Sequence, residues 1–147
     1  MSSTPLPPRY GAPVTFDEAR RVMAAAEAAC KAQGDWPMVI AIVGSGSHLV
    51  MLHALDHAQH ASVAVAQAKA VTANNFRRST KLLEDAVAGG GLGLRMLSMT
   101  EVCTVDGGLP LFRNGEVIGA IGVSGMNAAQ DAVIAAAGAA ALAGATA

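Results

Sequence analysis

The chain has 147 residues, a length typical of one domain, and its composition is 52% apolar, 14% charged and 3% aromatic with a net charge of -1. Because soluble domains carry about 25% charged residues, we expect part of the surface to be covered in a homo-oligomer, a dimer or higher. A nearly neutral chain with few aromatic rings gives no electrostatic or stacking basis for binding nucleic acid.

The cysteines and the two ends of the chain indicate where in the cell the protein is expected. Cys30 and Cys103 form no metal or redox motif, so we expect reduced thiols in a cytoplasmic protein. The N-terminal stretch lacks the apolar core of a signal peptide. The last twenty residues are apolar but mostly Ala and Gly, which favours a buried helix over a membrane span. We expect residues 1–14 to be loose or extended and residues 15–147 to form a single domain.

The first predicted elements are a helix and a hairpin. Thr15 and Glu18 form a capping box, and Gly34 ends the helix. Apolar residues recur along this helix at spacings of three and four. They are Phe16, Ala19, Met23, Ala26 and Cys30. Two apolar runs, 38–43 and 48–55, flank a Gly-Ser-Gly-Ser turn and predict an antiparallel hairpin.

The stretch 58–80 has no Gly or Pro and is rich in Ala, which predicts a long helix. Helical spacing places Gln67, Asn74 and Arg78 on one stripe, which is expected to face water. Lys69 lies roughly opposite, on the face that should be buried. The other residues of that face are Ser62, Val65, Thr72 and Phe76.

The second half predicts a short helix over 81–87, a flexible glycine-rich loop over 89–93, and a turn with a short strand within 96–105. Asn114-Gly115 between two apolar runs predicts a hairpin, with Arg113 facing Glu116. Asn127 and Gln130 cap a last helix that is apolar nearly all round, so we expect another subunit to cover it. The order of elements indicates an α+β fold with helices packed on an antiparallel five-stranded sheet.

Several stretches together resemble the GlcG/HbpS-like family, also called the haem-degrading domain family. They are Thr15–Arg20, His48-Leu49 with Leu55-Asp56, Ala68–Ala70 leading to Phe76 and Arg78–Thr80, Gly107–Leu111, Gly115–Gly125 and Gln130-Asp131. The resemblance covers Thr15 to Leu142. It implies a profilin-like fold, a homo-oligomer built of dimers, and an association with haem or corrinoids. Other members occur beside catabolic enzymes.

Lys69 is the main anomaly, because a buried ammonium is costly unless it is paired. It snorkels to the surface, binds an anionic ligand, or pairs with a buried carboxylate such as Glu101 or Asp106. In the ligand hypothesis Lys69 acts with Phe76, Arg78 and the Gly107-Gly108 amides. Lys69, Glu101 and Asp106 are also the candidate catalytic residues.

Three histidines, His53, His57 and His60, cluster within eight residues and are candidate ligands for a metal or haem iron. They are alternatively scattered surface or capping side chains. No zinc motif and no nucleophile elbow accompanies them.

Two functions remain open from the sequence. The first is a haem- or tetrapyrrole-binding protein with its pocket near a subunit interface. The second is a small-molecule enzyme, an isomerase, lyase or hydrolase, acting on an organic acid in a catabolic pathway.

Overall fold

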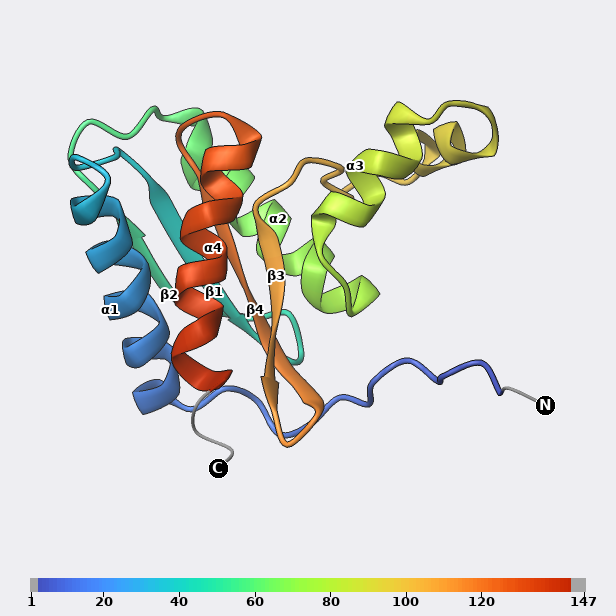
Figure 1. Ribbon diagram of the computed structural model, residues 1–147, viewed down its shortest axis with the longest axis horizontal. Helices are drawn as coiled ribbons and strands as arrows, with labels where there is room; N and C mark the ends of the chain where they lie inside the picture. The colour runs from blue at the N-terminus through green and yellow to red at the C-terminus, as the bar shows by residue number, and fades with distance from the viewer. Residues whose placement is uncertain (1–2, 144–147) are drawn as a thin grey trace.

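The computed structural model describes residues 3–143, which form a body of helices packed on a sheet, with a projecting arm (Figure 1). Its helices and strands are α1 (Phe16–Ala32), β1 (Val39–Gly44), β2 (Leu49–Ala54), α2 (Ala61–Phe76), α3 (Thr80–Ala88), the 3-10 helix η1 (Gly91–Ser98), β3 (Gly108–Arg113), β4 (Glu116–Ser124) and α4 (Ala128–Ala143). This order confirms the predicted α+β class. Among the described helices, none is both long and apolar enough to cross a membrane.

The sheet is antiparallel and has the strand order β2-β1-β4-β3. Across residues 3–143 it contains four strands, so the prediction of five was wrong. The expected fifth strand within 96–105 does not form, because residues 91–98 take up the 3-10 helix and the following chain forms no ladder with the sheet. The profilin-like topology implied by the resemblance stays a prediction.

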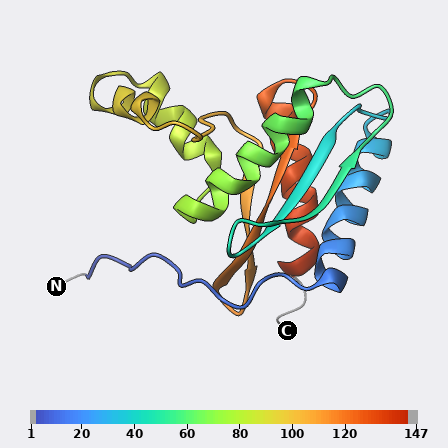
Figure 2. The ribbon, with the colours of Figure 1, turned by 180° about the vertical axis from the view of Figure 1, so that it is seen from behind.

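Helices cover both faces of the sheet. On one face, α1 and α4 pack against each other and against side chains such as Ile40, Ile118 and Ile121 (Figure 1). On the other face, α2 lies against β1 and β4 through alanines and valines (Figure 2). This second layer is thin: a Cβ on Gly122 of β4 would lie 2.0 Å from the Ala66 carbonyl oxygen. The small residues of α2 therefore serve close helix–sheet packing.

Local signals place most boundaries correctly. Thr15 and Glu18 form the reciprocal capping box of α1, and Asn127 and Gln130 exchange the same two bonds at the start of α4. Asn114 and Gly115 both have positive φ, 50° and 78°, as a tight hairpin turn between β3 and β4 requires.

Two segments extend from the body. The N-terminal stretch runs beside β4, where Gly11 N donates to Val117 O at 2.8 Å and Val14 N to Ile118 O at 2.8 Å. On the same side of the body toward which the N-terminal stretch extends, α3 and η1 project as an arm (Figure 1). The prediction of a loop over 89–93 was wrong for its second half, because residues 91–93 form the first turn of the 3-10 helix η1.

Candidate functional site

A groove of about 550 Å³ lies between α1 and the edge strand β2. The helical repeat of α1 and the two-residue repeat of β2 direct side chains into it from both sides. Its walls are mainly apolar. The lining residues are Phe16, Arg20, Arg21, Met23, Ala24, Glu27, Met51 and His53. His53 and Met51, two residues apart on β2, both point into the groove.

Two guanidinium groups stand at the end of the groove where α1 begins. Arg20 lies over the Phe16 ring, with Cζ 5.5 Å from its centroid, and donates to Asp17 Oδ1 at 2.9 Å. Arg21 Nε is 3.3 Å from the other Asp17 oxygen. The hydrogen bond from Arg20 lowers the pKa of Asp17. Because exposed ion pairs of this kind are weak, both cations remain available to an anionic ligand.

His53 is the imidazole of the groove. Its Nδ1 forms a short contact with Glu27 Oε1 on α1, and its side chain is 48% exposed. Glu27 also lines a second, more polar cavity of about 500 Å³. His57 lines that second cavity and adopts φ 69° in the loop after β2.

The three candidate histidines do not converge on one metal site. His53 points into the groove, His57 lines the neighbouring cavity, and His60 is the exposed N-cap of α2 without a side-chain capping bond. Within residues 3–143 no group of three His, Cys, Asp or Glu side chains is placed to hold a metal ion. Their roles as ligands stay predictions, and the groove favours His53 among them.

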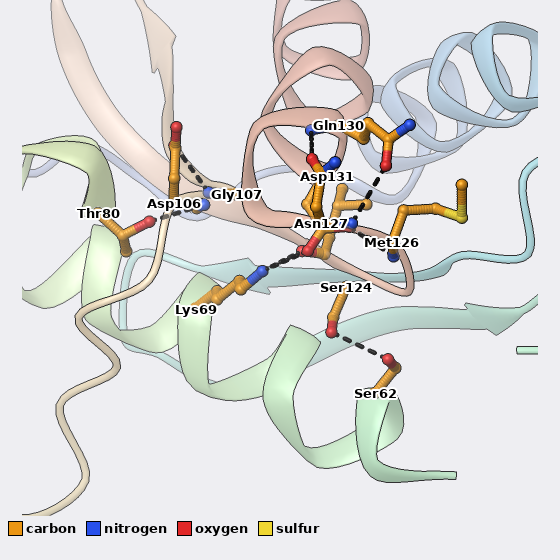
Figure 3. A network of polar contacts seen from close by, with 12 residues as sticks. Ser62, Lys69, Thr80, Asp106, Gly107, Ser124, Met126, Asn127, Gln130 and Asp131 are labelled. Atoms are coloured by element: carbon orange, nitrogen blue, oxygen red, sulfur yellow. Dashed lines mark hydrogen bonds and ion pairs between the residues drawn. The ribbon is translucent and has the colours of Figure 1, made fainter. Parts of the chain in front are cut away.

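Lys69 is buried, as the helical spacing predicted, with 1% of its surface exposed. Its ammonium donates to Asp131 Oδ2 at 2.7 Å and to Val123 O at 2.9 Å (Figure 3). Asp131 also accepts from Met126 N at 2.9 Å. Of the three alternatives, the structure contains the buried ion pair, and the carboxylate is Asp131 rather than Glu101 or Asp106.

The other candidate anion-binding groups bond to the chain itself. Gly107 N donates to Asp106 Oδ1 at 2.8 Å, Gly108 N to Thr80 Oγ1 at 2.9 Å, and Arg78 Nε to Phe76 O at 3.0 Å (Figure 3 shows the first two pairs). An anion would have to displace these bonds. The ligand-binding role of these residues, with Lys69, therefore stays a prediction.

The two remaining catalytic candidates, Asp106 and Glu101, differ in how far they are buried. Burial raises the pKa of Asp106, against the opposing hydrogen bond from Gly107 N. Glu101 is exposed, at φ 68° in the loop before β3. The catalytic role of both residues stays a prediction.

A comparison with models of protein families shows to which family the chain belongs. The family model described as "Haem degrading protein HbpS-like" matches residues 14–140. The chain belongs to the HbpS-like family. This confirms the resemblance inferred from the sequence motifs, and the matched range includes α1, β2 and every residue of the groove.

Two curated proteins are similar to this HbpS-like chain. An uncharacterized 15.0 kDa protein from the dhaT-dhaS intergenic region of Citrobacter freundii is 33% identical over 126 residues, which cover 84% of this chain and 88% of that protein. Protein GlcG of Escherichia coli K12 is 35% identical over 92 residues, which cover 63% of this chain and 67% of that protein.

A solved structure adds a bound molecule to the comparison. The crystal structure of the PduOC:heme complex has 30% sequence identity and a TM-score of 0.78, and the match covers 88% of this chain and 94% of that chain. A protein of the same fold and of related sequence is thus seen in a complex with heme.

Sequence reasoning missed part of the groove of this HbpS-like protein. No ligand-binding role was proposed from the sequence for three charged residues of α1 that line the groove, Arg20, Arg21 and Glu27. One signal was present: Phe16 was assigned to the apolar core stripe, yet it is 66% exposed, while the other four residues of that stripe are buried. An aromatic residue that begins the helix next to two arginines was the available indication of a surface site.

Proposed function

We propose that this protein binds haem or a related tetrapyrrole in the groove between α1 and β2. The observation that carries the proposal is the groove itself, which combines apolar walls, two guanidinium groups and one imidazole. Its volume of about 550 Å³ lies in the range typical of small-molecule sites. Membership of the HbpS-like family and the similarity to the PduOC:heme complex support the same ligand class.

The residues present match the chemistry of such a ligand. Phe16 and Met51 offer apolar surface to a flat ring. Arg20 and Arg21 suit the carboxylates that a haem carries at its edge, since guanidinium binds carboxylate in a bidentate manner. His53 is the nitrogen donor for the iron. When bound, haem supplies a redox-active iron, and the chain's part is to bind it, orient it and limit its contact with water.

The proposal also includes assembly. We infer a homo-oligomer because the arm carries large apolar side chains at its surface, with Leu92 80% exposed and Leu97 64% exposed. The sequence-based expectation that another subunit covers α4 is supported on one side of that helix, where Val133 is 48% exposed. The location of the ligand pocket near a subunit interface stays a prediction.

The test is a haemin titration followed by absorbance. We expect near-stoichiometric binding by the wild-type protein with a shifted Soret band, and His53→Ala should change the band position and weaken binding. Arg20→Gln with Arg21→Gln should keep the band position but weaken affinity by about tenfold to a hundredfold, the worth of one charge-assisted hydrogen bond of about 1.5–3 kcal/mol.

His57→Ala and His60→Ala are the matched controls, because both remove an exposed imidazole outside the groove. They should bind haemin as the wild type does. If His53→Ala keeps the wild-type spectrum and affinity, or if all histidine variants behave alike, haem binding through this groove is wrong.

A further inference from the structure

Glu27 and His53 form the one carboxylate–imidazole contact that joins α1 to β2 among the described residues. Glu27 Oε1 faces Nδ1 of the ring, and Nε2 has no hydrogen-bond partner within residues 3–143. Both side chains line the groove. The contact therefore fixes which of the two ring nitrogens is left for a ligand.

The chemistry of imidazole gives this contact a consequence. A neutral ring carries its proton on one nitrogen and an acceptor lone pair on the other. A carboxylate accepts hydrogen bonds, so it selects the form in which Nδ1 holds the proton and leaves the lone pair on Nε2. The same partner fixes the orientation of the ring, as in metal sites where a carboxylate supports a histidine ligand.

The position of Glu27 suits this task. Its side chain is 37% exposed, so it is partly withdrawn from water, and it stands between the groove and the polar cavity that His57 lines. The two arginines of the groove pair with Asp17 instead. Glu27 is thus the groove carboxylate that bonds to the His53 imidazole rather than to an arginine.

We propose that Glu27 is a positioning residue: it holds His53 in the Nδ1–H form, so that Nε2 is the atom presented to a ligand in the groove. The proposal rests on the proposed function in one respect, the identity of that ligand as the iron of haem. The tautomer itself is a property of the protein without any ligand.

The first measurement is therefore made without haem. Long-range 15N–1H NMR spectra at pH 8.5 report which ring nitrogen is protonated. We expect the wild-type protein to show the Nδ1–H form of His53. Glu27→Ala should shift the ring toward the Nε2–H form, which predominates in an unconstrained neutral histidine, whereas Glu27→Gln should retain much of the wild-type signal because its amide oxygen still accepts. Asp56→Asn removes a carboxylate from the neighbouring cavity and should leave the His53 signals unchanged.

The second measurement is haemin affinity in the same variants. Glu27→Ala should weaken binding by about tenfold or more, the usual effect of losing the partner of a histidine ligand, and Glu27→Gln should weaken it less. Asp56→Asn should match the wild type.

The outcomes separate the two proposals. An unchanged His53 tautomer in Glu27→Ala, or the Nε2–H form in the wild type, overturns the role of Glu27 whatever haemin does. If the tautomer changes while His53→Ala binds haemin normally, Glu27 does hold the ring but iron ligation fails, and the proposed function fails with it. Equal haemin affinity in wild type and Glu27→Ala, with His53→Ala impaired, also overturns the positioning role.

Discussion

At the scale of single residues, the Lys69–Asp131 pair holds three parts of the fold together. Lys69 comes from the middle of α2 and Asp131 from the first turn of α4 (Figure 3), and the Val123 carbonyl comes from the end of β4. Asp131 is 2% exposed, so neither charge has access to water. Removing one partner leaves a buried charge without compensation, which is more costly than removing both.

We therefore expect Lys69→Met to lower the free energy of unfolding by about 3–5 kcal/mol. The double variant Lys69→Met/Asp131→Asn should recover most of this loss, because the amide removes the charge and still accepts from Met126 N. Urea denaturation of wild type, both single variants and the double variant measures the coupling. A Lys69→Met protein as stable as wild type, or a double variant with purely additive losses, would contradict a buried ion pair.

At the scale of elements, Glu18 connects the start of α1 to β3. Its carboxylate accepts from Thr15 N within the capping box and receives a bidentate contact from Arg113, at 2.9 Å from Nε and 2.5 Å from Nη2. The hydrogen bond from Arg113 is the largest cause of its pKa falling to about 2, against an opposing effect of burial. Arg113 lies opposite Glu116 in the register, as predicted, but its guanidinium bonds to Glu18.

This depressed pKa gives a pH dependence with a definite sign. The pKa in the folded state lies below the unfolded value of 4.5, so the stabilisation is fully present above about pH 4.5 and is lost as the pH falls toward 2. We expect Glu18→Gln to cost about 1 kcal/mol at pH 7, where the pair is partly screened by solvent. The difference from wild type in urea unfolding should shrink to nothing near pH 2, and a constant difference from pH 7 to pH 2 would argue against the ion pair.

At the scale of the whole molecule, the arm lies at the opposite end from α1 and β2 (Figure 1), the two elements that line the groove. The leucines of the arm, such as Leu92 and Leu97, are exposed because the body of the protein does not cover η1, in which no residue is buried. An arm of this kind gains stability when a second subunit covers it, since each large apolar side chain contributes about 1.5–3 kcal/mol on full burial.

We expect light scattering at micromolar concentration to give at least the mass of a dimer. Leu92→Glu with Leu97→Glu should lower that mass without unfolding the body, because both side chains are exposed. Val133→Glu tests the alternative surface on α4. Ile134→Glu is not a useful test, since Ile134 is fully buried and a charge there would disrupt the core. A monomeric wild-type protein would refute the assembly.

Sequence reasoning succeeded where a few neighbouring residues decide the outcome. The boxes at Thr15 and Asn127 and the turn at Asn114-Gly115 each depend on groups within three residues of one another. The burial of Lys69 followed from helical spacing in the same way. One such inference was wrong: Asn74 was expected to face water, but it is fully buried and donates to Ser45 O and Ser47 Oγ in the turn between β1 and β2.

The partners of these residues depended on tertiary structure, because contacts between distant parts of the chain follow from strand order. Lys69 and Asp131 are 62 residues apart, and Glu18 and Arg113 are 95 apart. The groove likewise needs Glu27 and His53, 26 residues apart, to meet where α1 crosses the edge strand β2. The sequence by itself determined the family, the helix caps and the hairpin turns, since these depend on local backbone geometry and short motifs. The order β2-β1-β4-β3 decided which carboxylate neutralises Lys69 and which histidine faces the groove, because only packing of the helices on that sheet brings those side chains within bonding distance.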